Sequence, residues 1–446
     1  MENKRIQLSD HFTYKKLFRF VLSPIVMMVF TSIYGVVDGY FVSNYVGKTP
    51  FAAVNLIMPF LMILGGFGFM IGTGGSALVS KTLGEKNKEE ANRIFTLMVI
   101  ATFVLGIVLT IVGIIFVRDI AYLFKATDDM IDDCVLYGKI VLAFNSAFMI
   151  QNVFQSFFIT AEKPKLGLII TVIAGCTNIV LDALFMAVFN WGIKGAAVAT
   201  GISQTVGALI PIGYFILPNN SLLKFTKPKF DIKAILKACG NGSSELMSNI
   251  SSSIVSIVYN FQLMKYIGEN GVAAYGTIMY VQFVFVAIFI GYSIGAAPII
   301  GYNYGAQNDK ELKNMFKKSV IVMSGLGAIM FVLAILLSSI FAKIFVGYDA
   351  DLYKLTVHAF YLFSFVFIFA GFNIFISSFF TALNNGVISA IVSFLRTLVF
   401  QLASVIILPL IFGIDGIWWS ITLAEVFAFI VSLIFVIVKK KEYHYA

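Results

Sequence analysis

Long apolar segments alternate with short polar ones along the whole chain. Each apolar run has about twenty or more residues and few charges, which is enough for a helix to cross a bilayer of ~30 Å. The runs are continuous and show no period of two, which excludes the strands of an outer-membrane barrel. The pattern predicts twelve membrane-spanning helices, at residues 20–43, 52–79, 95–117, 136–160, 167–189, 196–217, 236–264, 273–301, 319–342, 355–382, 387–411 and 417–438.

The composition also indicates a polytopic α-helical membrane protein. Of the 446 residues, 59% are hydrophobic and 12% are charged, against roughly a quarter charged in a soluble domain. The cysteines Cys134, Cys176 and Cys239 are scattered and predict neither a disulfide framework nor a metal site. The basic segment 1–20 has no small-residue cleavage site after a short apolar core, so we expect no removable signal peptide.

Positive charge falls mainly on one side of the predicted membrane. With the N-terminus and alternate loops placed on one side, that side holds 23 of the 32 Lys and Arg residues. The positive-inside rule then places both termini and the basic linker 218–235 in the cytoplasm. This topology accounts for the net charge of +9 without a nucleic-acid partner. We therefore expect a multi-pass protein of a bacterial-type plasma membrane.

The chain matches itself at a constant offset of 221 residues. Tyr45–Met58 resembles Tyr266–Met279, and the same offset pairs Asn87 with Asn308. Each half holds six predicted spans, so the halves are parallel repeats around a central cleft, as in alternating-access transporters. Duplicated bundles in channels and membrane enzymes are the alternative. The predicted division is an N-terminal lobe at 1–217, the linker 218–235 and a C-terminal lobe at 236–446.

Several polar residues are predicted to lie at one depth inside the first half. Asp38 is a lone carboxylate in the first span, where an unpaired charge costs several kcal/mol. Asn178 and Asp182 share one face of the fifth span at i, i+4. Thr200 lies as far after the turn between the fifth and sixth spans as Asp182 lies before it. All are ~13 Å below the outer surface, and Tyr34, one turn from Asp38, can donate to a carboxylate.

Carboxylate, amide and hydroxyl oxygens at one depth suit protons or a small hard cation. The alternative is that ordinary hydrogen bonds hold the two carboxylates and lock the bundle. Two ionised carboxylates at one depth repel, however, unless a proton or a cation lies between them. The second half has Tyr259, Val399 and Ala403 at the equivalent positions, so we expect the ion site in the first half.

The second half has polar residues of its own inside predicted spans. Arg396 could pair with Glu425 or with Glu245, and structural and functional roles for these residues both stay open. Pro24 lacks a backbone donor and either bends the first span or eases its start. Weaker candidates for the lining of a substrate cleft are Gln282, Asn373, Asn152 and Arg396.

Specific segments resemble the multidrug and toxic compound extrusion (MATE) family, in its prokaryotic DinF-like or MepA-like branch of the MOP flippase superfamily. The resemblance covers the twelve spans and the repeat. It rests on residues 23–47, on the G-x-x-x-x-A-A-V of 47–54, on 72–91, on Asn178 and Asp182, and on GIKGAAVAT at 192–200.

The resemblance implies an antiporter that exports organic cations and other drugs in exchange for Na⁺ or H⁺, without a bound cofactor. In the family an Asp on the first helix, an Asn and an Asp on the fifth and a Thr on the sixth form the cation site. Asp38, Asn178, Asp182 and Thr200 occupy these positions here. The family's other branch has an acidic residue deep in the seventh helix, which this sequence lacks.

Other classes of protein fit the sequence less well. A flippase or exporter of lipid-linked or other amphipathic substrates is the alternative within the superfamily, but such proteins usually have a more cationic cavity. An enzyme is not expected, because the three histidines are dispersed and no nucleophile–base pair appears. Neither a channel filter nor an oligomer is indicated, so we expect a monomer that binds small molecules within the bilayer.

Overall fold

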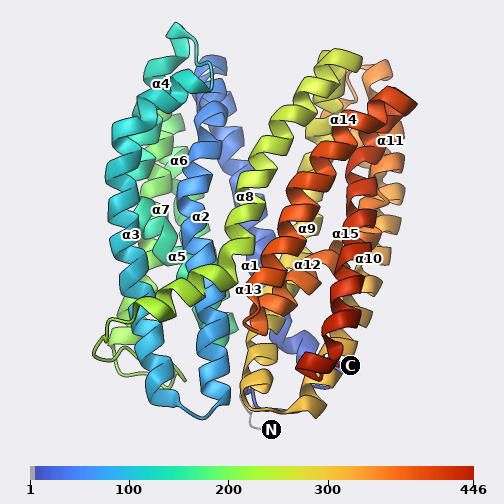
Figure 1. The fold of residues 1–446 in the computed structure, drawn as a ribbon. Helices are drawn as coiled ribbons and strands as arrows, with labels where there is room; N and C mark the ends of the chain where they lie inside the picture. Colours follow the sequence, from blue (N-terminus) through green and yellow to red (C-terminus); the bar gives the residue numbers. More distant parts are fainter. Residues whose placement is uncertain (1–5) are drawn as a thin grey trace.

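A computed structural model describes residues 6–446 and shows an all-helical protein without strands in that range (Figure 1). The helices gather in two groups that diverge toward the top of Figure 1. We call α1–α7 the N-lobe and α8–α15 the C-lobe. The end of the bundle that carries the C-terminus and the first described residues is called the lower end. Residues 1–5, which belong to the segment considered for a signal peptide, lie outside the described range.

The helices of the N-lobe include two short π-helical segments, η1 and η2, which directly follow α1 and α6. The bounds are α1 Tyr14–Phe41, η1 Val42–Val46, α2 Lys48–Gly84, α3 Lys88–Leu123, α4 Asp128–Ala143, α5 Asn145–Thr160, α6 Pro164–Asp182, η2 Ala183–Val188 and α7 Gly192–Ile216.

The C-lobe includes a third π-helical segment, η3, between two α-helices. Its bounds are α8 Ile232–Tyr266, α9 Glu269–Gly305, α10 Asp309–Val346, α11 Ala350–Phe363, α12 Val366–Ala382, α13 Gly386–Phe394, η3 Leu395–Val399, α14 Phe400–Phe412 and α15 Ile414–Tyr443.

The two lobes repeat each other in detail. Helices α2 and α9 have 37 residues each, and both their first and last residues are 221 positions apart. The helix caps repeat as well: Asn87 accepts from the backbone N–H of Glu90 at 3.2 Å, and Asn308 accepts from that of Glu311 at 3.3 Å. The sequence repeat therefore reflects a repeated fold.

The number of spans agrees with the twelve predicted, with one difference in character. In the described range, nine helices are long and apolar enough to cross a membrane, and two bent pairs, α4–α5 (53°) and α11–α12 (47°), bring the number to eleven. The twelfth, α8, has 35 residues but is less apolar, because serines recur along 243–256. Polar side chains on a spanning helix belong on a protein-facing or water-facing side.

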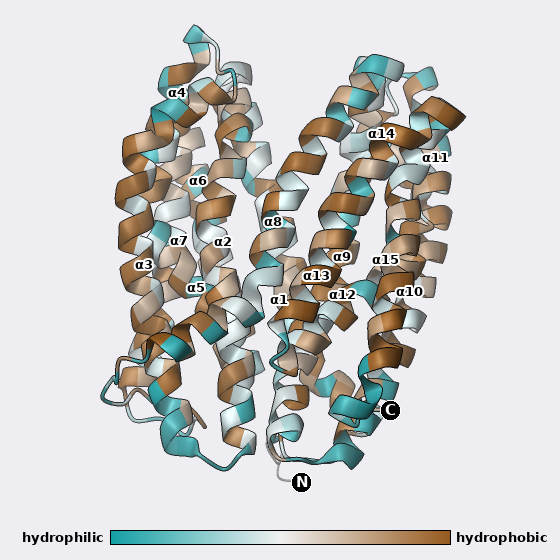
Figure 2. Cartoon of the chain, in the orientation of Figure 1, coloured by the Kyte–Doolittle hydropathy of each residue, from teal (hydrophilic) through white to brown (hydrophobic). Residues whose placement is uncertain are grey.

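The outer faces of the bundle are apolar, whereas the lower-end loops are hydrophilic (Figure 2). Ile111 and Ile115 on α3 and Leu336 and Ile344 on α10 are each more than half exposed. A soluble monomer does not display continuous apolar faces of this size. In a bilayer the same side chains contact lipid tails, so the surface agrees with a membrane-spanning protein.

The lobes contact each other closely in the lower half of the bundle. On α2, a methyl group at Gly74 would overlap the carbonyl oxygen of Ala238 in α8, and one at Gly242 would overlap that of Met70. Small residues allow backbones to approach in this way. The contact between α2 and α8 therefore depends on glycine at both positions.

The segment before α1 also connects the lobes at the lower end. The backbone N–H of Leu8 donates to Oε1 of Glu162 in the N-lobe at 2.9 Å. The N–H of Phe12 donates to Oε1 of Glu311 in the C-lobe at 2.9 Å, and His11 Nδ1 lies 2.7 Å from the other oxygen of Glu311. Leu8 and Phe12 are fully buried. This segment therefore holds the lower ends of the two lobes together.

The α2–α8 contact predicts the effect of adding one methyl group. Gly74→Ala should lower the free energy of unfolding by about 1–3 kcal/mol, because rigid backbone must shift. Thermal unfolding in detergent measures the loss. Gly213→Ala is the matched control, since no atom lies within 4 Å of a Cβ added there. Equal midpoints for the two variants would contradict the close contact.

Candidate ion-binding site

Asp38 and Asp182 both lie close to the point where an α-helix becomes a π-helix, Asp38 four residues before η1 and Asp182 directly before η2. At the end of α1, the N–H of Val42 donates to the carbonyl oxygens of both Asp38 and Gly39. Asp182 is the last residue of α6 and directly precedes η2. A π-helical turn locally changes the direction of side chains and is frequent at functional sites. Asp182 therefore directly adjoins irregular backbone, and Asp38 lies one turn before such backbone.

Helices α1 and α6 pack closely beside these carboxylates. A Cβ at Gly175 of α6 would lie 2.5 Å from Cε1 of Phe30 and 3.0 Å from Cδ1 of Tyr34. Glycine is therefore required for the two rings to lie against α6. Tyr34 precedes Asp38 by one turn on α1, and Gly175 precedes Asn178 by about one turn on α6. The packing thus brings the two polar helix faces together.

The carboxyl groups of Asp38 and Asp182 lie within hydrogen-bonding reach of each other. Asp182 is fully buried and Asp38 is partly buried. No donor in the described range reaches Oδ1 of Asp38 or either oxygen of Asp182. Two carboxyl groups this close can share a hydrogen bond only if one carries a proton. If both are ionised, a cation is needed between them.

The other predicted ligands lie in the same interior without bonding to the pair. Asn178 is buried with Nδ2 unpartnered, and Oγ1 of Thr200 is buried without a partner. A residue that the sequence prediction missed, Tyr137 of α4, lies beside Thr200 and within electrostatic range of both carboxylates. Tyr137 is ten residues after the helix cap Thr127. Counting residues from the nearest turn, as was done for Thr200, would therefore have placed Tyr137 at a similar depth.

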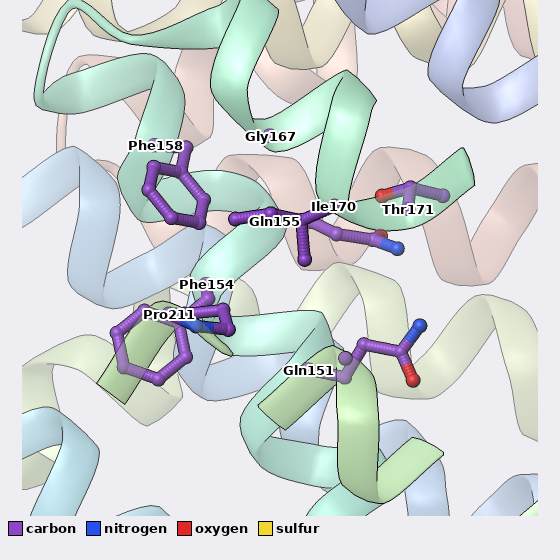
Figure 3. A pocket seen from close by; sticks show the side chains of 9 residues that line it. Gln151, Phe154, Gln155, Phe158, Gly167, Ile170, Thr171 and Pro211 are labelled. Carbon is purple, nitrogen blue, oxygen red and sulfur yellow. The ribbon is translucent and has the colours of Figure 1, made fainter. Parts of the chain in front are cut away.

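Further polar atoms without partners line the N-lobe interior. They are Oε1 of Gln151, Nδ2 of Asn152 and Oε1 of Gln204. A cavity of about 10 Å³ between α5, α6 and α7 is lined in part by Gln151, Gln155 and Thr171 (Figure 3). This volume is close to the lower limit for one water molecule, and buried polar atoms of this kind are commonly satisfied by water. The N-lobe interior is therefore suited to ordered water below the aspartates.

The C-lobe has a packed tyrosine where the N-lobe has Asp38, whereas Ala403, the counterpart of Asp182, is exposed. Tyr259, the counterpart of Asp38, is fully buried, and its hydroxyl donates to the carbonyl oxygen of Ile417 at 2.6 Å. Its ring stacks on Tyr275 with centroids 4.3 Å apart. The single O–H donor of Tyr259 is therefore used. Both positions lie within a helix, but the π-helical segment that follows Asp38 has no counterpart after Tyr259, and the side-chain chemistry differs.

Of the two ion pairs considered for Arg396, the structure contains the one with Glu425. Nε of Arg396 donates to both carboxylate oxygens at 2.8 and 3.0 Å, and Nη2 lies 2.8 Å from Oε1. Nδ2 of Asn373 donates to Oε2 of the same carboxylate at 2.7 Å. Glu425 is 1% exposed, so this is a buried, hydrogen-bonded ion pair.

The structure does not gather the predicted cleft residues at one place. Asn152 lies in the interior of the N-lobe and Asn373 in the interior of the C-lobe. Gln282 is partly buried on α9, with Oε1 unpartnered. The Arg396 side chain, at 15% exposure, remains partly accessible. The sequence showed that these residues are polar, but it did not show which lobe interior each side chain enters.

Pro24 lies inside α1, which continues through it without a break. It packs against α9, where a Cβ at Gly291 would lie 2.8 Å from the Pro24 carbonyl oxygen and one at Gly295 would lie 3.2 Å from Cγ. Pro24 therefore stands at the contact between α1 and the C-lobe.

Comparison with known families agrees with this fold. The sequence model of the MatE family matches residues 24–184 and 233–407. The chain therefore belongs to the MatE family, which confirms the resemblance seen in its sequence. It is a multi-pass membrane transporter of that family, and the all-helical fold with twelve spans is confirmed as well.

Two relatives are similar over nearly the whole chain. The multidrug export protein MepA of Staphylococcus saprophyticus subsp. saprophyticus is 24% identical over 440 residues, which are 95% of this chain and 93% of that protein. MepA of Staphylococcus haemolyticus is 24% identical over 423 residues, which are 92% of this chain and 90% of that protein.

Solved structures of MATE proteins share the fold. A crystal structure of MATE in complex with MaL6 has a TM-score of 0.93 at 21% identity and covers both chains fully. An outward-facing multidrug resistance MATE family transporter has a TM-score of 0.92 at 22% identity, covering 100% of this chain and 99% of that one. A MOP superfamily transporter from Pyrococcus furiosus Vc1 has a TM-score of 0.90 at 22% identity, covering 98% of each chain.

Because Asp38 and Asp182 lie in contact without a protein donor, we expect this functional pair to lower the stability of the folded protein. In sodium-free buffer at pH 8, Asp38→Asn should raise the free energy of unfolding by about 1–2 kcal/mol. The amide removes one charge and can donate to the remaining carboxylate. Thermal unfolding in detergent measures the gain, with Asp119→Asn, an exposed position on α3, as control. A lower midpoint for Asp38→Asn would show that a partner already stabilises this carboxylate.

Proposed function

We propose that the protein is a secondary active antiporter that exports organic cations and other drugs in exchange for Na⁺ or H⁺. The observation that carries this proposal is the contact between Asp38 and Asp182 without a donor from the surrounding protein. Such a pair needs a positive charge, and in a transporter that charge can be the transported coupling ion. Export of drugs is also the function named for the MepA relatives.

The ion acts by changing the charge of the N-lobe interior. When a proton or Na⁺ binds between Asp38 and Asp182, the repulsion between their carboxylates is removed and α1 can move closer to α6. Because α1 also packs on α9 at Pro24, a shift of α1 changes the contact between the lobes. Asn178, Thr200 and Tyr34 supply hydrogen bonds or ligands around the ion. Binding is thereby coupled to the opening of one end of the bundle.

The charge distribution supports an orientation for this cycle. The basic linker 218–235 is held against α3 at the lower end, where Lys224 N donates to Asn92 Oδ1 at 2.9 Å and Thr226 N to Thr96 Oγ1 at 3.1 Å. By the positive-inside rule we place this end and both termini in the cytoplasm of a cell with a bacterial-type plasma membrane. The linker then separates lobe 1–217 from lobe 236–446 in a monomer, and the lobes diverge toward the outside (Figure 1).

Organic cations fit the charge of the interior better than acidic lipid-linked substrates do. Arg396 is neutralised by Glu425, so it adds no net positive charge. Asp38 and Asp182 in one lobe and Glu245 in the other leave an acidic interior. A flippase of anionic lipid-linked substrates would need the opposite polarity.

Transport by the purified protein in liposomes tests the proposal. A fluorescent cationic dye is followed under an imposed Na⁺ gradient and, separately, under a pH gradient. Movement with the Na⁺ gradient alone would identify a Na⁺ site, and movement with the pH gradient alone a proton pair. Movement with neither gradient would contradict the proposal and favour the flippase.

Asp182→Asn should reduce ion-driven dye transport by at least about a hundredfold, because the amide can neither release a proton nor supply the anionic ligand. Its thermal unfolding should stay cooperative. Asp119→Asn, remote from the site, should transport as the unmodified protein does. Undiminished transport by Asp182→Asn would remove the aspartate pair from the mechanism.

A further inference from the structure

Glu245 of α8 is a carboxylate that neither the ion exchange nor the helix packing uses. Gly242, Glu245 and Asn249 follow one another at spacings of three and four and therefore share one face of α8. Gly242 contacts the α2 backbone at Met70, and a Cβ at Gly66 of α2 would lie 3.5 Å from Nδ2 of Asn249. Glu245 lies between these two contacts. It therefore faces the boundary between the lobes.

The Glu245 side chain has no partner of opposite charge in direct contact. Within residues 6–446 its carboxylate makes neither a hydrogen bond nor an ion pair, although its backbone carbonyl accepts from Asn249 at 3.0 Å. The residue is partly buried. An unpaired carboxylate inside a spanning helix is costly and is typically retained for a function. This position therefore favours a positively charged ligand.

Arg396 is within electrostatic range of Glu245 but is held by a different carboxylate. Its hydrogen bonds go to Glu425, with distances of 2.8–3.0 Å. Asn373 fixes Glu425 from the other side by donating to its carboxylate at 2.7 Å and to its backbone oxygen at 2.9 Å. In this arrangement the hydrogen bonds of Arg396 go to Glu425 and none goes to Glu245. The carboxylates of Glu245 and Glu425 and the guanidinium of Arg396 together carry one net negative charge.

This group of charges belongs to the C-lobe alone. The N-lobe residues at the repeat positions of Glu245, Arg396 and Glu425 are the uncharged Pro24, Gly175 and Gln204. Arg396 also lies in η3, the third π-helical segment, and the other two directly follow the helices that end near Asp38 and Asp182. Asp38, Asp182 and Arg396 thus each lie in or near a π-helical segment, and such segments are frequent at functional sites.

We propose that Glu245 binds the cationic centre of the exported substrate, and that Glu425 and Asn373 position Arg396 so that this carboxylate stays available. The inference rests on the proposed export of organic cations and deepens it by assigning the substrate charge to α8. The ligand class is a monovalent organic cation with a large apolar surface. The coupling ion and the substrate then use different carboxylates, Asp38 with Asp182 in the N-lobe and Glu245 in the C-lobe.

Equilibrium binding of tetraphenylphosphonium to the full-length protein in detergent, followed by calorimetry, tests the assignment. Glu245→Gln should weaken binding by about tenfold or more, because a charge–charge contact at a partly buried site is lost. Glu245→Asp keeps the charge and should retain most of the affinity, which separates loss of charge from misfolding. Glu269→Gln, an exposed change at the start of α9, is the matched control and should leave affinity unchanged.

A double substitution tests the positioning role of Glu425. Glu425→Gln releases Arg396, which can then pair with Glu245, so tetraphenylphosphonium binding should weaken by a factor similar to that of Glu245→Gln. Adding Arg396→Gln removes the competing cation and should restore affinity to within about threefold of the unmodified protein. A pair with only a structural role would make the double variant at least as impaired as Glu425→Gln alone.

The outcomes separate this inference from the proposed function. If the unmodified protein and Glu245→Gln bind tetraphenylphosphonium equally, the assignment of Glu245 is wrong while organic-cation export stands. If the unmodified protein does not bind tetraphenylphosphonium, the organic-cation class is wrong and the assignment falls with it. Weakening by Glu245→Gln, retention by Glu245→Asp and rescue by Arg396→Gln together establish it.

Discussion

The structure depends on two carboxyl groups, Asp38 and Asp182, that contact each other inside a membrane bundle without a donor from the protein. Two buried negative charges at this distance repel, and the low dielectric of the interior strengthens the repulsion. The surrounding features keep the pair together: α1 reaches α6 at Gly175, and both acids stand beside π-helical backbone. A fold that maintains this contact requires a small positive charge there, which is the physical basis of the ion coupling that we propose.

The two lobes show how a duplicated fold can divide its chemistry. Backbone caps and helix lengths repeat at the offset of 221 residues, but the buried polar residues do not. The N-lobe interior contains two carboxyl groups without a protein donor, whereas in the C-lobe Tyr259 is hydrogen-bonded and Arg396 pairs with Glu425. Close packing leaves little room to alter helix geometry, while single side chains at interior positions can change freely. The duplicated backbone thus carries two different electrostatic interiors.

Several close contacts between the lobes could transmit motion from one to the other. The glycine contacts join α2 to α8, Pro24 and Gly291 join α1 to α9, and the segment at Leu8–Phe12 bonds to both lobes. Contacts of backbone against backbone are rigid, so a shift of α1 is transmitted rather than absorbed. Helix α8 takes part in the lobe contact and carries Glu245, which brings the candidate substrate charge next to the moving boundary.

The sequence by itself determined the spans, the repeat, the family and the common depth of Asp38, Asp182 and Thr200. Hydropathy and residue counts give positions along the membrane normal, because a helix rises by a constant 1.5 Å per residue. They do not show how the helices and their side chains are arranged around that normal. The tertiary structure alone decided that Arg396 pairs with Glu425 and leaves Glu245 free, that Tyr137 joins Thr200, and that Asn152 and Asn373 enter separate interiors. Each of these depends on which helices are neighbours, and neighbours are chosen by packing across segments far apart in the chain.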